Sequence, residues 1–377
     1  MNRLLLILLC LVPTLIFSQI DTITPKKKKW PFSVIQKLQE GNLKFIPIPA
    51  FSVSPEKGVS FGLILEYFFN TADSANKKQT RLSNAYVNLQ YSTLKQGVAE
   101  LVYSIYTNKE KYYLQGAIGF KDFYERYWTF SEDTVDNKNF RGLTYQQLYL
   151  RGKVLKQYSN QLFVGVNYNV NQHRNITFES KATPAIPNVI GLNKSFVVGI
   201  GPLLIIDKRD NQFSPQKGWY GEVGARFHQK TLGSRFNYSQ YQLDVRRYIV
   251  TKPKGILALH ATTTLHGGDV PFLEKQRLGS DKIMRGYFAG RFRDNQFAAA
   301  QIEYRYPIGK SFIITAFASA GQTAPTIPEM HLQNMQSSVG GGFRYLANKE
   351  KLLYLRFDAG YTKQGNWGFY INLGDAF

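Results

Sequence analysis

Hydrophobic and polar residues alternate with a period of two along most of the chain after residue 43. In the stretch 296–308, for example, Glu303 and Arg305 fall on one face, and Tyr304 falls on the other. This alternation is typical of β-strands, whose successive side chains point to opposite faces. The alternating segments are about 10 to 13 residues long, which exceeds the usual soluble strand and suits a tilted strand that crosses a membrane.

Counting these segments and the breaks between them predicts sixteen strands, with the approximate bounds 43–53, 58–70, 80–92, 97–107, 111–122, 142–156, 161–172, 194–206, 217–228, 235–249, 255–267, 296–307, 311–321, 337–346, 351–362 and 366–377. Many of the breaks are tight turns, such as "PIGK", and others are long polar stretches, such as 268–295. Bacterial outer-membrane barrels combine short periplasmic turns with long external loops. The pattern therefore predicts an all-β fold, a closed antiparallel transmembrane β-barrel with both termini in the periplasm.

The first residues predict export. Residues 1–18 combine an early positive charge, an apolar run and a final small residue, which is the pattern of a secretory signal peptide. We expect 19–42 to form a short periplasmic segment and 43–377 to form the barrel. The only cysteine, Cys10, lies in the apolar run, so the mature chain is expected to contain none. Export leaves two classes, a soluble periplasmic β-protein and a barrel in the outer membrane of a diderm bacterium.

The balance of charges is strongly basic. The chain has 47 Lys and Arg against 26 Asp and Glu, a formal net charge of +21. Such a balance often indicates nucleic-acid binding, but export makes nucleic acid an improbable partner. Outer-membrane lipids and lipopolysaccharide, which are anionic, are the partners that we expect instead.

No motif in the sequence predicts catalysis. The stretch "IGKSF" contains part of a phosphate-binding loop, but Tyr304 stands where that motif needs its first glycine. His260 and His266 share a face, but six positions along a strand separate them by about 20 Å, too far for one metal ion. We therefore expect no enzyme activity, no cofactor and no metal.

Four stretches of the chain carry a family resemblance. They are "IDKRDNQFSPQKGWYGEV" (206–223), "MRGY" (284–287), "AAQIEYRYPI" (299–308) and the final pair "LRFDAGY…GFYINLGDAF". In this order they resemble the membrane domain of the BamA/TamA superfamily of outer-membrane barrels, the bacterial surface antigen family. The resemblance implies a barrel that assists the insertion or translocation of proteins or lipids at the outer membrane. A passive pore and a structural outer-membrane protein are the alternatives.

The resemblance also bears on partners. The founding members of the family carry periplasmic POTRA domains that receive substrate, and the segment 19–42 is too short for such a domain. Substrate or accessory periplasmic proteins of unknown identity are therefore expected to be partners of the barrel.

The long loop 268–295 carries the first set of candidate residues. Gly286 would let the backbone approach the barrel wall, and Tyr287 would pack there. Arg285 could then form a charge-assisted pair with Glu303, which points inward by strand parity. The alternative is an arginine exposed on an outer loop. In either case this loop decides whether the lumen is open or filled.

One position departs from the family pattern. Relatives show F-x-D-x-G on the thirteenth strand, and this chain has Ser319 in place of the acid. A neutral hydroxyl would hold Arg285 more weakly than a carboxylate. We therefore expect Glu303, helped by Asp358, to hold the loop.

Two further motifs follow from the resemblance. The strand–turn–strand motif contributes Asp207, Arg209, Asp210, Pro215 and Gly218. The last strand resembles a barrel sorting signal, with the candidate assembly residues Gly368, Ile371, Leu373 and Phe377. Strand parity predicts that the side chain of Phe377 faces the lipid, as Trp367 and Phe369 do. The family also implies a weak seam between the first and last strands, and the first strand contains Pro47 and Pro49, which lack ladder donors.

Overall fold

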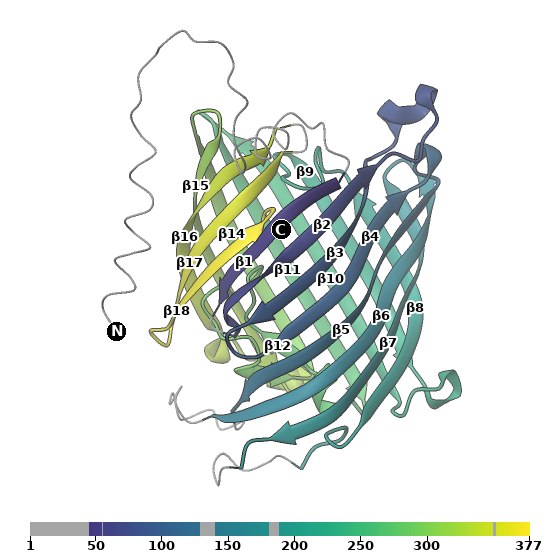
Figure 1. The fold of residues 1–377 in the computed structure, drawn as a ribbon, viewed down its shortest axis with the longest axis vertical. Helices are drawn as coiled ribbons and strands as arrows, with labels where there is room; N and C mark the ends of the chain where they lie inside the picture. Colours follow the sequence, from purple (N-terminus) through teal and green to yellow (C-terminus); the bar gives the residue numbers. More distant parts are fainter. Residues whose placement is uncertain (1–44, 55, 129–139, 181–187, 350–351) are drawn as a thin grey trace.

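The computed structural model describes residues 45–54, 56–128, 140–180, 188–349 and 352–377. The expected signal peptide, 1–18, lies outside the described residues, as does the expected periplasmic segment, 19–42. The described chain forms a barrel of tilted strands around a lumen (Figure 1). None of the described helices is long and apolar enough to cross a membrane.

Sixteen antiparallel strands form one sheet and follow one another in chain order. They are β1 (Phe45–Ser54), β2 (Gly58–Phe69), β3 (Ser83–Ser92), β4 (Gly97–Tyr106), β5 (Tyr112–Tyr127), β6 (Arg141–Ser159), β7 (Leu162–Phe178), β8 (Ser195–Asp207), β9 (Gly218–His228), β10 (Tyr238–Thr251), β11 (Gly255–Gly268), β14 (Gln296–Ile308), β15 (Phe312–Ala324), β16 (Gln336–Asn348), β17 (Leu353–Thr362) and β18 (Trp367–Leu373). The predicted all-β fold with about sixteen antiparallel strands is confirmed. A second, small sheet pairs β12 (Gln276–Leu278) with β13 (Phe292–Asp294) inside the β11–β14 loop.

The strands differ from the predicted segments mainly at their ends. β5, β6 and β7 extend beyond their predicted bounds because their outer residues continue to pair, as Glu125 of β5 does with Leu143 of β6. β18 ends at Leu373 and not at Phe377, because Gly374 has a φ of +83° and turns the chain out of the strand. The last residues of the chain are therefore not part of the wall.

The two faces of the wall have opposite chemistry. Large apolar side chains such as Phe61, Ile118 and Val223 point outward, and about half of their surface is exposed. Charged side chains such as Glu303 and Arg305 point inward and are buried. A β-protein dissolved in water buries the apolar face instead. The arrangement fits a barrel whose outer face contacts lipid.

The sheet has a seam between its first and last strands. β1 and β18 lie in contact, but the hydrogen-bonded order of the sheet begins at β1 and ends at β18. Within the described residues no ladder joins these two strands. Pro47 and Pro49 lie in β1, and an edge strand tolerates proline because one side of it makes no ladder. The predicted closed barrel is therefore nearly closed.

The barrel should be heat-modifiable on a denaturing gel. A closed hydrogen-bonded wall resists detergent until it is heated, because each strand is held by a neighbour on both sides or, at the seam, on one side. We expect an unboiled sample to migrate differently from a boiled one. Identical migration of the two samples, or recovery of the protein in a soluble fraction, would contradict the architecture.

Candidate functional site

The β11–β14 loop contacts widely separated parts of the wall. Near its base, Arg277 and Arg293 both pair with Glu125 of β5, with N–O distances of 3.1 and 2.5 Å. Near its tip, the backbone N–H of Ala289 donates to Glu56 in the β1–β2 turn, at 2.8 Å. These contacts hold the loop across one end of the barrel, and in Figure 1 it lies within the outline of the wall.

The tip of the loop approaches β17 and β18 so closely that only glycine fits. Gly286 has a φ of +109°, and a Cβ atom there would lie 2.9 Å from Thr362 Cγ2 and 3.0 Å from the backbone of Gly360. Its N–H donates to the hydroxyl of Tyr370, at 2.9 Å. Gly368 of β18 meets Gly286 in turn, because a Cβ atom at position 368 would lie 2.9 Å from the Gly286 Cα. The glycines of the loop and of the last strands thus form one contact.

Tyr287 attaches the same tip to the wall through apolar packing and through hydrogen bonds of its hydroxyl group. Its ring belongs to a buried cluster with Met284 of the tip and Phe297 and Ala299 of β14. Its hydroxyl donates to the carbonyl of Ser337, at 2.9 Å. The contacts of Tyr287 therefore reach β14 and β16.

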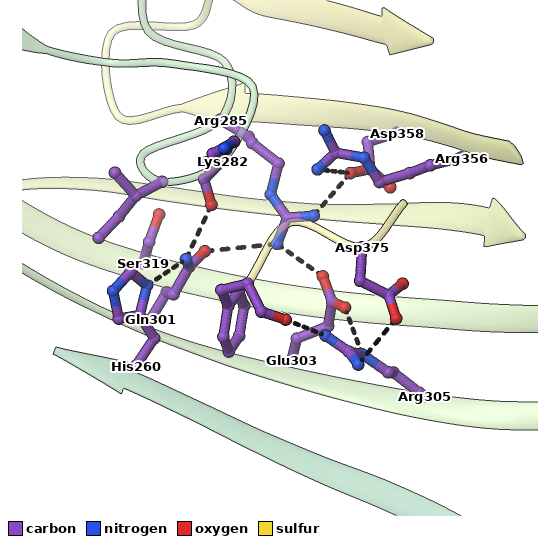
Figure 2. Close-up of polar contacts among 12 residues, drawn as sticks. His260, Lys282, Arg285, Gln301, Glu303, Arg305, Ser319, Arg356, Asp358 and Asp375 are labelled. Carbon is purple, nitrogen blue, oxygen red and sulfur yellow. Dashed lines mark hydrogen bonds and ion pairs between the residues drawn. The ribbon is translucent and has the colours of Figure 1, made fainter. Parts of the chain in front are cut away.

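Arg285 lies between these two anchors and is completely buried. Its guanidinium pairs with Glu303 of β14 at 2.8 Å and with Asp358 of β17 at 2.6 Å. The guanidinium carbon lies 3.4 Å from the centre of the Phe317 ring, a cation–π contact. Figure 2 shows Arg285 reaching between the two carboxylates. The structure thus brings together Arg285, Glu303 and Asp358, as the sequence predicts.

The same carboxylates bind two further buried arginines. Arg305 pairs with Glu303 at 2.8 Å and with Asp375 at 3.1 Å. Arg344 pairs with Asp358 at 2.5 Å, with Asp375 at 3.2 Å and with Glu303 at 3.4 Å. Each of these carboxylates is therefore shared between guanidiniums.

A fourth arginine closes the cluster on the loop side. Arg356 pairs with Asp281 of the loop at 2.9 Å and with Asp358 at 3.4 Å. We call this cluster the arginine network, and its formal charges balance: its members are Arg285, Arg305, Arg344 and Arg356 with Asp281, Glu303, Asp358 and Asp375. The balance offsets the cost of burying charge in a partly desolvated lumen.

Sequence reasoning missed five members of the network, Asp281, Arg305, Arg344, Arg356 and Asp375. Strand parity placed Arg305 and Arg356 on the same inward faces as Glu303 and Asp358, so a signal for those two was present. Asp375 gave no such signal, because it lies after the turn at Gly374.

The expected weak contact between Ser319 and Arg285 is wrong. The hydroxyl of Ser319 instead exchanges a 2.7 Å hydrogen bond with the hydroxyl of Ser338 on β16. The Phe317 ring, which precedes Ser319 by one inward position on β15, occupies the space beside the guanidinium. Serine is too short to reach past that ring.

The expected lipid-facing position of Phe377 is also wrong. Its ring is buried and stacks on the inward ring of His260, with centroids 5.1 Å apart. Its backbone oxygen accepts a hydrogen bond from Arg305 at 3.1 Å. Parity fails here because the turn at Gly374 takes Asp375 to Phe377 into the lumen, where Asp375 reaches the network. Of the other C-terminal candidates, Gly368 and Ile371 lie in β18, and the side chain of Leu373 lies outside the described part.

The strand–turn–strand motif packs at the same end of the barrel as the C-terminal residues. Asp207 pairs with Arg209 at 2.8 Å, and Asp210 accepts the backbone N–H of Gln216 at 2.9 Å. Gly218 has a φ of +105°, where a side chain would overlap the backbone of Lys208. The motif is thus a folded turn that is held by an ion pair and hydrogen bonds between its own residues.

This turn also touches the arginine network. The carbonyl of Pro215 accepts a hydrogen bond from Arg305 at 3.4 Å, and Ser214 donates to Asp375 at 2.6 Å. The β8–β9 turn and the C-terminal residues, which are far apart in the chain, therefore meet at Arg305 and Asp375, and the loop joins the same network through Glu303. Among the described residues there is no cluster of three or more His, Cys, Asp or Glu that could hold a metal ion.

Breaking the Arg285 pairs should destabilise the barrel. Arg285→Ala leaves two buried carboxylates with one partner fewer each, and loss of one member of a buried ion pair costs about 3–5 kcal/mol. Glu303→Gln should cost a similar amount, and the double variant should cost clearly less than the sum, because the two changes remove the same contact. The measurement is urea unfolding in lipid vesicles, with Arg247→Ala, an exposed arginine on β10, as the control. Additive losses would show that the pair contributes nothing.

The lumen position of Phe377 can be measured with a membrane probe. Phe377→Cys and Phe369→Cys variants are labelled with a fluorescent thiol reagent and folded into vesicles that contain brominated lipids, which quench by contact. Phe369 is about half exposed on the outer face, so its label should be quenched. The fluorescence of the label at position 377 should not be quenched. Equal quenching at both positions would show that residue 377 faces the lipid.

Comparison with known proteins places the fold. The model of the Omp85 superfamily domain matches residues 74–377. No curated protein matches the chain. BamA from Haemophilus ducreyi lacking POTRA domains 1–3 has a TM-score of 0.56 at 12% identity, covering 86% of this chain and 69% of that one. CdiB from Acinetobacter baumannii has a TM-score of 0.55 at 13% identity, covering 88% of this chain and 59% of that one, so this chain spans less than two thirds of it. The chain therefore belongs to the Omp85 superfamily and is an outer-membrane β-barrel.

Proposed function

We propose that this barrel assists the insertion of proteins into the outer membrane, or the export of proteins or lipids across it, by opening sideways between β1 and β18. The observation that carries the proposal is the seam, where the two strands touch but no described ladder joins them. Every other neighbouring pair of wall strands is held by a ladder. The seam is therefore the place where the wall separates at the lowest cost in hydrogen bonds.

The loop supports this proposal because it touches both sides of the seam. Gly286 binds Tyr370 on β18, and Ala289 binds Glu56 at the end of β1. Arg285 fixes the tip to β14 and β17 through the arginine network. In this proposal the loop regulates opening, since release of either contact frees one edge of the seam.

The proposed partners follow from the same geometry. The outward apolar face contacts lipid, and lipopolysaccharide is the anionic partner of a chain with a net charge of +21. Substrate reaches the seam from the periplasm, where an accessory protein delivers it. The proposed activity uses no cofactor and no catalytic residue.

A passive pore is the alternative function, and the segments that fill the lumen make it less favoured. An open pore of sixteen strands encloses a water-filled channel. In this barrel the β11–β14 loop occupies one end, and the C-terminal residues and the β8–β9 turn meet the arginine network from the other. These segments leave separate chambers in place of one wide channel.

A disulfide across the seam tests the proposal. Ser52 of β1 and Asn372 of β18 line the same small cavity at the seam, so the test replaces both in Ser52→Cys with Asn372→Cys and checks formation of the disulfide by gel mobility before the assay. Vesicles that contain the protein should speed the insertion of a separate unfolded barrel protein. Oxidation should abolish the acceleration, and a reductant should restore it.

The matched control places the crosslink within the wall. Asn84 of β3 and Ser104 of β4 are direct register partners, and a disulfide between cysteines there should leave the acceleration unchanged. A barrel that never accelerates insertion would refute the function. Acceleration that survives the seam disulfide would refute lateral opening alone.

A further inference from the structure

The loop divides the lumen into two parts of different chemistry. On one side, Arg285 faces the charge-balanced arginine network against β14 to β17. On the other side, Lys282 of the same tip lines cavities against the opposite wall. The carbonyl of Lys282 accepts a hydrogen bond from Gln301 at 2.8 Å, which fixes the loop between the two parts (Figure 2).

Three adjoining cavities follow the opposite wall, formed by strands from β3 to β11. Their volumes are about 480, 550 and 450 Å³. The first and second share Lys153 and Lys282 in their linings, and the second and third share Arg151 and Arg226. We call the three together the basic chamber. Each is within the size range of small-molecule sites.

The basic chamber holds cations that form no ion pair with any described carboxylate. Arg226 donates only to amides, to Asn167 at 2.6 Å and to Gln240 at 3.0 Å. Lys121 and Arg151 lie on the ring of Tyr149, 5.0 and 5.1 Å from its centre. Within the described part of the chain these three and Lys282 form no ion pair.

The carboxylates that face the chamber are already engaged. Glu222 pairs with Lys153 at 2.8 Å. Glu100 accepts hydrogen bonds from the neutral side chains of Asn88 and Tyr149, so it keeps its negative charge near Lys121 and Arg151, which still outnumber it. In the third cavity, burial raises the pKa of Glu274 in the loop to about 7, although a hydrogen bond from Asn171 opposes the shift. Positive charge therefore predominates in the chamber at neutral pH.

Two further carboxylates line the first cavity, and both are paired. Asp207 binds Arg209 and Arg81, and Asp244 binds Arg246. The side chain of Lys282 is exposed toward the first and second cavities, so its ammonium group can reach a ligand there. A bound anion would supply the missing partner to this group of cations.

The remaining lining is rich in amides that can meet hydroxyl groups. Gln115 and Asn169 line the chamber and form no side-chain hydrogen bond to any described residue. Each amide offers two donors and a carbonyl acceptor. Phosphate groups suit the unpaired guanidinium and ammonium groups, and sugar hydroxyls suit the free amides.

We infer that the basic chamber is a binding site for a phosphorylated saccharide, held through its phosphates by Lys121, Arg151, Arg226 and Lys282. The inference goes beyond the function proposed above and does not depend on it, since the chamber lies across the loop from the arginine network. A free sugar phosphate and the phosphorylated sugar of lipopolysaccharide share this chemistry.

Calorimetric titration of the folded barrel in detergent tests the inference. Fructose 1,6-bisphosphate is the probe, with fructose and inorganic phosphate as its separate parts. The bisphosphate should bind saturably and more tightly than phosphate, and fructose should not bind measurably. Phosphate that binds as tightly as the bisphosphate would overturn the saccharide assignment, and no saturable binding of the bisphosphate would overturn the site.

Two variants locate the binding. Arg151→Gln and Arg226→Gln should each weaken the bisphosphate by about tenfold or more, because each removes one charged contact with phosphate. Arg247→Gln, an exposed arginine on the outer face of β10, should change nothing. Unboiled gels check that all variants fold. Folded chamber variants that bind as well as the unchanged protein would overturn the site.

A competition experiment distinguishes the two sources of the ligand. Lipopolysaccharide stripped of its acyl chains is added to barrel that is saturated with the bisphosphate. Displacement supports the site and identifies the lipid-borne sugar as a ligand. Absence of displacement, with bisphosphate binding intact, supports the site and assigns it to a soluble sugar phosphate.

Discussion

The interior of this barrel depends on the burial of the Arg285 guanidinium between Glu303 and Asp358. A guanidinium remains charged at any physiological pH, so its burial requires carboxylates at fixed positions. Those carboxylates in turn need further cations, which Arg305 and Arg344 provide. If the loop left the lumen, Arg285 would lose both carboxylates, and Glu303 and Asp358 would each lose one cation. The close approach of Gly286 to β17 and β18 holds the loop in place.

The same constraint joins segments that the chain separates by long distances. The loop supplies Asp281 and Arg285, and the C-terminal residues supply Asp375, which also binds Ser214 of the β8–β9 turn. Displacement of any one of these segments removes an ion pair or hydrogen bond from a carboxylate that the other segments also bind. Charge complementarity therefore organises this part of the lumen, beside the apolar cluster in which Tyr287 packs.

The fold was predictable because strand periodicity is a local property. Alternation located the sixteen strands, and parity correctly directed Glu303 and Asp358 into the lumen. The path of Phe377 was not predictable by the same rule, because a single left-handed glycine, Gly374, ends the alternation. Shared ion pairs such as that of Arg344 with Asp375 depend on how the barrel closes in three dimensions, and no spacing in the sequence encodes them.

The early end of β18 gives the wall an asymmetric edge. β1 has 10 residues and β18 has 7, and the chain after β18 turns inward at the end of the barrel that holds both termini of the wall. Within the described residues, β1 is paired by a ladder on one side only, with β2. Unmatched edges act as templates for another strand. A strand that paired antiparallel with this edge of β1 would have to finish at the same end of the barrel as β18 does.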